Sequence, residues 1–347
     1  MLSVKLAAAV LACLPAAIAS ATFGTWTNDD CTGDYFEVTA NGGCFSDNSG
    51  DSPYSDPEKR KDCAPVHTIY NFPNGTWVEN LAVRSSGNIL VTLDTAPEVW
   101  EIHPTNYSAS LVHTFPNATS TMGITEIKPD YFAVVVGNFS LATFLGTKGS
   151  WNVVDANFLN GLTTQPHAAS NVLVADANQG VIFEVNISTG TSRVLIDDPA
   201  LKPNETTQAS VGSIHSRGDY LYFTNSFASP VLGRFTLAEN GTAMGPAETI
   251  VSKPNYPTLL GGWANDFALD ANGNAFIATD TSNSLVRAAP SGELIIVAGG
   301  VNSTVVEGDT SAAFGRTSRD SKTLYLTAHG DSGYPGKVLA VDVAAYS

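Results

Sequence analysis

The chain has 347 residues, of which 33 are acidic and 17 basic, for a formal net charge of −16. This balance leaves no basic stripe to neutralise phosphates, so we expect neither nucleic acid nor an anionic membrane as a partner. Beyond the first 20 residues, no apolar stretch approaches the roughly 20 residues that a membrane-spanning helix needs. We therefore expect a soluble protein without a membrane anchor.

Residues 1–20 have the pattern of a secretory signal peptide. Lys5 precedes an apolar run over residues 6–18, and small residues around Ala19 form an A-x-A-like exit. We therefore expect a secreted protein, or one in the lumen of the secretory pathway. The density of N-x-Ser/Thr sequons also predicts a glycosylated secreted protein. The eight sequon asparagines are Asn74, Asn106, Asn117, Asn138, Asn186, Asn204, Asn240 and Asn302.

Residues 21–63 form a loop-rich segment that is rich in Asp, Gly, Ser and Asn. This segment contains Cys31, Cys44 and Cys63. In an oxidising compartment we expect two of the three to form a disulfide, and the sequence does not indicate which two. A metal or redox site is the alternative, but neither C-x-x-C spacing nor clustered histidines accompany these cysteines.

Residues 64–347 contain an internal repeat. Residues 263–288 align without gaps on residues 77–102, so that Trp263 falls on Trp77 and Asp280 on Asp94. Each copy reads as short apolar strands separated by polar turns, which predicts an antiparallel meander. Looser copies begin near Tyr131, Val172, Leu221 and Leu324, about 40 to 55 residues apart, which is typical of propeller blades.

The repeat predicts an all-β protein: one six-bladed β-propeller of four-stranded antiparallel blades. A single meander cannot bury both of its faces, so the copies must stack side by side. We expect the segment Val66–Tyr70 to add a strand to the blade built from Leu324–Val343. Such pairing closes the ring and removes an open sheet edge.

Two stretches, His67–Thr92 and Thr310–Thr327, resemble the fungal secreted branch of the gluconolactonase/regucalcin-like propellers. The resemblance implies a divalent cation such as Ca²⁺ at one mouth of the central channel, held by oxygen ligands. Matching by position assigns Glu79, Asn160 and Asp266 as its ligands. The fourth blade departs from the pattern, because residues 211–215 read VGSIH where a ligand Asn before Gly is expected. These three residues have alternative structural roles as strand caps or turn residues.

Other candidate site residues follow from their predicted positions near the inner strands. Trp77 and Trp263 precede inner strands, so they either line the channel mouth or pack between blades. Asn80 and Thr125 are candidate substrate contacts beside them. His215, His329 and Arg316 are candidate hydrogen-bond donors to a substrate. For Arg316 the alternative is that its guanidinium ties the last blade to its neighbours.

No nucleophile motif, zinc-binding H-E-x-x-H, phosphate loop or dinucleotide fingerprint occurs in the chain. Secreted fungal propellers similar to this one include hetero-Diels–Alderases, which join a tropolone-derived o-quinone methide to a humulene-type sesquiterpene. That resemblance implies a pericyclase with small apolar substrates and no required cofactor. Metal-dependent lactone hydrolysis is the second hypothesis, and a non-catalytic secreted binding module is the third.

Overall fold

The computed structural model describes most of the chain after residue 62, together with the two paired N-terminal strands β1 (Thr22–Trp26) and β2 (Tyr35–Thr39). The main described ranges are residues 63–140, 145–147, 156–204, 209–252, 263–300 and 303–346. The predicted signal peptide, Cys31, Cys44 and Asn302 lie outside them, so the secretion signal and the disulfide pairing stay predictions. No helix in the described part is long and apolar enough to span a membrane.

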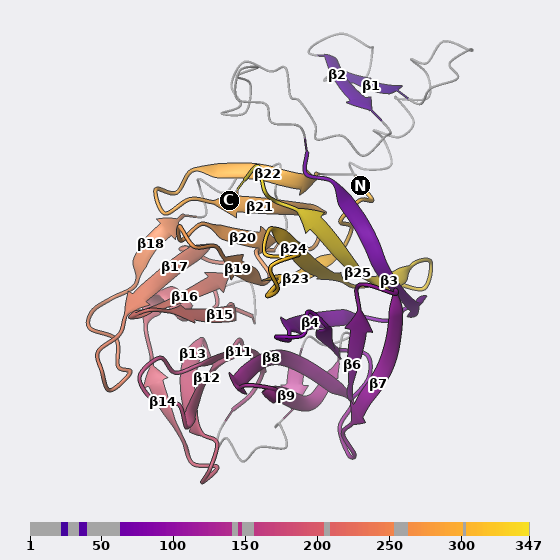
Figure 1. The fold of residues 1–347 in the computed structure, drawn as a ribbon. Helices are drawn as coiled ribbons and strands as arrows, with labels where there is room; N and C mark the ends of the chain where they lie inside the picture. The colour runs from indigo at the N-terminus through magenta and orange to yellow at the C-terminus, as the bar shows by residue number, and fades with distance from the viewer. Residues whose placement is uncertain are drawn as a thin grey trace.

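Six sheets follow one another around a central axis, which confirms the predicted propeller (Figure 1). We number these sheets blades 1 to 6, each with its first strand innermost. Blade 1 comprises β4 (Val78–Val83), β5 (Ile89–Leu93), β6 (Glu98–His103) and β7 (Ser108–Thr114). Blade 2 comprises β8 (Ser120–Lys128), β9 (Tyr131–Ser140) and β10 (Leu145–Thr147). Blade 3 comprises β11 (Leu159–Thr164), β12 (Asn171–Asp176), β13 (Val181–Asn186) and β14 (Ser192–Ile196).

The remaining blades repeat this order. Blade 4 comprises β15 (Val211–Arg217), β16 (Tyr220–Asn225), β17 (Leu232–Thr236) and β18 (Glu248–Val251), and a short 3₁₀ helix, η2 (Pro199–Leu201), precedes it. Blade 5 comprises β19 (Phe267–Leu269), β20 (Ala275–Ala278), β21 (Ser284–Ala288) and β22 (Leu294–Gly299). Blade 6 comprises β23 (Asp309–Phe314), β24 (Thr323–Ala328), β25 (Pro335–Asp342) and β3 (Val66–Asn74). Within the described residues, blade 2 alone has three strands instead of the predicted four.

The ring closes through β3, as predicted. This N-terminal strand pairs antiparallel with β25, with Val66 opposite Val341 and Tyr70 opposite Val338. Blade 6 therefore takes its outer strand from the beginning of the propeller and its inner three from the end. Closure removes the free edge that β25 would otherwise present.

Local sequence explains why the blades form. The second strands are almost continuously apolar, because each is buried on both faces between neighbouring blades; every residue of β5 is buried. The turns that precede the second strands of blades 1 and 5 require a left-handed backbone. Gly87 and Gly273 occupy equivalent positions in the repeat and have φ values of 89° and 85°.

Loss of buried apolar area in β3 should destabilise the whole ring. Phe72 is buried against the core of blades 1 and 6 and packs edge-on against Trp100 at 5.8 Å between ring centroids. We expect Phe72→Ala to lower the free energy of unfolding by about 3–5 kcal/mol. His67→Ala, on an exposed position of the same strand, should change it by less than about 0.5 kcal/mol. Urea denaturation checks both, and equal effects would contradict closure by β3.

Candidate active site at the channel mouth

A pocket lies where the inner strands begin, at one mouth of the central channel. It encloses about 610 Å³ of space, including its opening to solvent. Its walls come from the starts of the inner strands and from the turns between the second and third strands. The lining residues are Trp77, Glu79, Asp94, Met122, Phe139, Phe158, Asn160, Ala177, Ala209, Ser210, Gly212, Ser226, Phe227, Trp263, Asn265 and Asp280. We call it the mouth pocket.

One side of the mouth pocket is acidic. The Trp77 indole Nε1 donates a hydrogen bond to Glu79 Oε2 at 2.5 Å. The indole also stacks on the His329 imidazole, with ring centroids 4.2 Å apart and planes 14° from parallel. His329 Nε2 in turn lies 3.0 Å from Asp280 Oδ1. Blades 1, 5 and 6 thus contribute to one connected array of indole, imidazole and carboxyl groups.

Burial raises the pKa values of two carboxyl groups on this side of the pocket, those of Glu79 and Asp94. Desolvation raises the pKa of Glu79 to about 7, against the lowering effect of the Trp77 hydrogen bond and with a further increase from the charge of Asp280. Desolvation also raises the pKa of Asp94 to about 8, and the charge of Glu79 adds to it. A protonated carboxyl group is a hydrogen-bond donor, so this side of the pocket can donate to a substrate oxygen at neutral pH.

His329 is the partner of these acids and is itself perturbed. Burial alone lowers the pKa of His329, but the hydrogen bond that its imidazole donates to Asp280 and the charge of Asp280 outweigh burial and hold the pKa above its usual value. His329, which the sequence predicted as a donor to the substrate, instead stacks on the Trp77 indole and fixes its orientation. It is not among the residues that line the pocket.

The other side of the mouth pocket is aromatic and apolar. Phe139 stacks on Phe158 with ring centroids 4.9 Å apart, and Phe227 meets Trp263 at 5.3 Å and 63°. Met122 completes this wall. Trp263 therefore lines the pocket as one sequence alternative predicted, and so does Trp77. The pocket can bind an oxygenated apolar molecule with its oxygen against the acids and its carbon skeleton against the aromatic rings.

Asp266, which the resemblance groups with Glu79 and Asn160, is not among the residues that line the mouth pocket. It accepts hydrogen bonds from the Asn80 Nδ2 at 2.9 Å and the Ser311 Oγ at 2.6 Å, both at Oδ2. His215 Nε2 lies 2.7 Å from its Oδ1. These four side chains, which we call the axial cluster, join blades 1, 4, 5 and 6 across the channel. None of the four lines the mouth pocket, so Asn80 and His215 are cluster members and not the pocket contacts that the sequence predicted.

Asp266 is charged in this cluster. Burial raises the pKa of Asp266, but the charge and hydrogen bond of His215 and the hydroxyl of Ser311 outweigh it and leave the pKa below its usual value. Glu79 and Asp266 are both buried, so the opposite shifts of their pKa values come from their different partners. Asp266 has Asn80, Ser311 and His215 as side-chain hydrogen-bonding partners, whereas Glu79 has the indole donor.

The internal repeat explains the misplacement. With Trp77 on Trp263, Glu79 falls opposite Asn265, and Asn80 falls opposite Asp266. The structure follows this register, because Glu79, Asn160 and Asn265 all line the mouth pocket. One residue along a strand is enough to move a side chain to the opposite face.

The residues at the pocket do not match the implied metal site. Glu79, Asn160 and Asn265 supply oxygen donors of the kind that hard cations prefer, but Gly212 provides no side chain from blade 4. The raised pKa of Glu79 also opposes cation binding, since a ligand carboxyl group must be ionised. Among the described residues, no group of three or more His, Cys, Asp or Glu side chains is arranged to hold a metal ion. We therefore derive no step through a metal.

Arg316 and Thr125 lie away from the pocket. Arg316 Nη1 donates to the Val83 carbonyl at 3.0 Å and to the Glu126 carboxylate. Val83 ends β4, whose opposite end carries the pocket residues, so Arg316 ties blade 6 to blades 1 and 2 at the far end of the channel. Thr125 pairs with Ala133 within blade 2 and does not line the pocket. Both are corrections to the predicted donor and substrate-binding roles.

Comparison with solved structures identifies the class of fold. The chain is similar to the calcium-binding protein regucalcin of Agrobacterium tumefaciens, with a TM-score of 0.57 and 16% identity over 81% of this chain and 94% of that one. It is also similar to a gluconolactonase of Xanthomonas campestris, with a TM-score of 0.55 and 10% identity over 81% and 90% of the two chains. The fold is that of the regucalcin and gluconolactonase propellers. No family model matches the sequence.

Two relatives found by sequence comparison carry the same assignment. The chain is 26% identical over 330 residues to a protein of Sarocladium schorii assigned as a hetero-Diels-Alderase, covering 77% of this chain and 78% of that one. It is 26% identical over 312 residues to another so assigned from a Phoma species, covering 76% and 87%. Both resemblances inferred from the sequence are thus supported.

Asp94→Asn should stabilise the protein in a pH-dependent way. The pKa of Asp94 is raised from an ordinary value of about 4 to about 8 in the folded protein. Across that interval the unfolded carboxyl group is ionised while the folded one stays neutral, so the parent loses stability as pH rises. The variant should therefore gain stability over the parent from pH 4 to pH 8, reaching on the order of 5 kcal/mol. Thermal denaturation against pH checks this, with the exposed Asp219→Asn as control. A gain that is independent of pH would contradict a neutral Asp94.

His215→Ala should affect stability more than turnover. It removes a partner from the buried Asp266 carboxylate, and we expect a loss of about 1–3 kcal/mol in the free energy of unfolding. Because the pKa of Asp266 is lowered, this loss should be largest above its ordinary pKa and should shrink as pH falls below it. Turnover should stay within a few-fold of the parent. A hundredfold loss of rate in a stable variant would restore His215 to the reaction site.

Proposed function

We propose that this protein is a pericyclase that acts in the mouth pocket. The proposed reaction is a hetero-Diels–Alder addition between an o-quinone methide of tropolone type and a humulene-type sesquiterpene. The observation that carries the proposal is the division of the pocket into an acidic side and an aromatic side. The resemblance to two hetero-Diels-Alderases over about three quarters of the chain supports the same chemistry.

The pocket suits a reaction that needs no nucleophile. Holding two reactants in reacting geometry replaces a bimolecular encounter by an effectively unimolecular step, and this alone removes several kcal/mol of barrier. The aromatic wall of Phe158, Phe227 and Trp263 supplies apolar area and shape for such binding. The walls come from several blades of a closed ring, so they are held rigidly.

The acidic side supplies the donor. Asp94 and Glu79 are buried and have pKa values of about 8 and about 7, so at least one proton remains on the pair at neutral pH. A hydrogen bond from that proton to the quinone carbonyl stabilises the negative charge that grows on the oxygen in the transition state. Trp77 and His329 act as positioning residues, because they hold the Glu79 carboxyl group in place.

The donor hypothesis predicts a pH profile and a pattern of variants. Asp94→Ala should lower kcat roughly a hundredfold, as expected for loss of one preorganised donor. Asp94→Asn keeps N–H donors, so its kcat should remain within about tenfold and should no longer fall above pH 8. Cycloadduct formation from a tropolone o-quinone methide precursor and α-humulene is the measurement. Dividing the kcat of the variant by the kcat of the parent at each pH cancels any effect of ionisation of the substrate. Equal rates in parent and Asp94→Ala would exclude this donor.

Metal-dependent lactone hydrolysis is the second candidate, since the fold is shared with a gluconolactonase and Glu79, Asn160 and Asn265 offer oxygen donors. Hydrolysis of glucono-δ-lactone that appears with added Ca²⁺ and disappears with a chelator would favour it. A protein that binds either substrate without turnover would be the third candidate, a binding module.

We further propose that the protein is secreted and glycosylated. Six of the sequon asparagines are exposed in the described residues: Asn74, Asn106, Asn117, Asn138, Asn204 and Asn240. None of these asparagines lines the mouth pocket, so glycans there would leave the pocket open. A mobility shift of the secreted protein on treatment with an N-glycosidase tests both points.

A further inference from the structure

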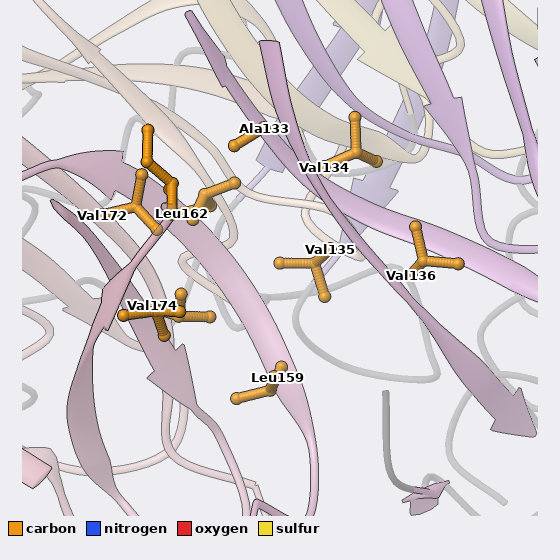
Figure 2. A pocket seen from close by; sticks show the side chains of 10 residues that line it. Ala133, Val134, Val135, Val136, Leu159, Leu162, Val172 and Val174 are labelled. Carbon is orange, nitrogen blue, oxygen red and sulfur yellow. The ribbon is translucent and has the colours of Figure 1, made fainter. Parts of the chain in front are cut away.

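The faces of the blades are covered by neighbouring blades, but their outer edges are not. Figure 2 shows how blades 2 and 3 cover each other, with Val135 of β9 packed toward Leu162 and Val174 of blade 3. Within the described residues, the outermost strand of each blade has no further strand beside it in its sheet. An unpaired edge with apolar side chains is prone to pair with another chain, so soluble proteins protect such edges.

Four of the five outer strands in the four-stranded blades are protected in recognisable ways. β3, β14 and β18 carry Pro73, Arg193 and Glu248 respectively, and proline and charge both hinder edge pairing. β22 carries neither, but all of its residues are half-buried or buried. The backbone N–H of Ala64 also donates to the Val297 carbonyl at 2.8 Å, so the chain before β3 contacts this strand.

β7, the outer strand of blade 1, has none of these protections. It reads SASLVHT, without Asp, Glu, Lys, Arg or Pro, and six of its seven residues are exposed. Leu111 and Val112 are 49% and 53% exposed, and Tyr107, just before the strand, is 61% exposed. These three are half of the six large apolar side chains that are exposed in the described part of the chain. Exposed apolar surface is therefore concentrated at this edge.

A bulge does not distinguish β7 from the other outer strands. The pairing of β6 with β7 passes from Leu111 to His113 and leaves Val112 as an extra residue. Similar register shifts occur at the outer strands of blades 3, 4 and 5. Those strands carry a charge or are covered in addition, so the bulge alone does not account for protection of this edge.

A glycosylation sequon lies at each end of β7. N-Y-S begins at Asn106 and leads into the strand, and N-A-T begins at Asn117, three residues after the strand ends. Both asparagines are exposed. Asn106 Oδ1 accepts hydrogen bonds from the Ser108 N–H at 3.2 Å and the Ser108 hydroxyl at 2.8 Å, and these contacts leave its Nδ2 available to carry a glycan. The strand is about 20 Å long, so Leu111 and Val112 lie between two closely spaced attachment points.

We propose that N-linked glycans at Asn106 and Asn117 cover the free edge of β7 and keep the protein monomeric. This inference rests on the proposed glycosylation and adds a role for two of its sites. An N-linked glycan is bulky and solubilising, so it shields Leu111 and Val112 and blocks the approach of another strand. The net charge of −16 opposes association of the chain in general, but β7 contributes no carboxylate to it and needs local protection.

Removing the two glycans tests the proposal. Ser108→Ala with Thr119→Ala abolishes both sequons at exposed positions and keeps both asparagines. For the full chain secreted from a yeast host, we expect light scattering after size exclusion to show a monomeric parent. The protein mass of the double variant should be at least about twofold higher, as edge-to-edge pairing produces. Adding Leu111→Lys should restore the monomer, because a charge on the edge opposes pairing.

A matched control removes two exposed sequons away from β7. Asn204→Gln with Asn240→Gln should stay monomeric like the parent. Association of this control to the same extent as the β7 variant would overturn the proposal, because loss of any glycans would then suffice. Association that Leu111→Lys does not reverse would also overturn it, because the contact between copies would then lie on another surface.

Mass spectrometry of glycopeptides separates this inference from the proposed glycosylation. Occupied Asn106 and Asn117 with a double variant that stays monomeric would overturn the shielding role and leave glycosylation standing. Glycans at Asn204 and Asn240 but at neither end of β7 would likewise overturn this inference alone. A secreted chain without any glycan would overturn both.

Discussion

The arrangement of this propeller depends on one buried carboxylate, that of Asp266. It receives hydrogen bonds from Asn80 of blade 1 and Ser311 of blade 6, and it contacts His215 of blade 4. A buried charge is tolerated only when it is paired and hydrogen-bonded, so each of these partners must stay in place. Because the partners lie on inner strands of different blades, satisfying one charge fixes the positions of four strands around the axis.

The mouth pocket takes its geometry from those same strands. Glu79 precedes Asn80 in blade 1, and Asn265 precedes Asp266 in blade 5. These two pocket residues are therefore each next in sequence to a member of the axial cluster. The strands that the cluster fixes thus also fix the walls of the pocket. The charge on Asp266 has a second effect, since it contributes to the raised pKa of Glu79 after burial and the charge of Asp280. An ionised acid in the cluster thereby favours a neutral acid in the pocket.

Much of the architecture was predictable because it follows from periodicity. The alignment of residues 77–102 with 263–288 indicated the blades, and closure by β3 followed from the need to cover an edge. Trp77 and Trp263 were expected at the channel mouth because they precede inner strands, and Glu79 and Asn160 were expected there from the resemblance; all four line the pocket. Asp94 and Asp280 were missed, although they align with each other in the repeat. They lie in turns between strands, and turns carry no periodic signal of burial.

The positions of Asn80 and His215 differ from the predicted pocket contacts for a physical reason that lies in the inner strands of blades 1 and 4. Pairing between first and second strands shifts register between Val78 and Asn80 in blade 1, and again between Val211 and Ile214 in blade 4. Similar shifts occur in blades 2, 3 and 6. A bulge inserts one residue and so reverses which side chains face inward beyond it. The alternation of inward-facing and outward-facing side chains therefore does not hold along the inner strands between the pocket and the axial cluster. Bulges of this kind are frequent beside active sites.

The two sides of the mouth pocket reinforce each other. Burial raises the pKa values of Glu79 and Asp94, so at least one of the two keeps its proton at neutral pH. An apolar ligand that displaces the remaining water should desolvate both acids further and raise their pKa values. In the proposed reaction, binding of the sesquiterpene therefore favours the protonated carboxyl group that donates to the quinone methide. A hydrolase at the same mouth would need ionised ligands and an activated water, which the same apolar surroundings disfavour. Whether the mouth pocket favours cycloaddition or hydrolysis therefore depends on how much water a bound ligand displaces from it.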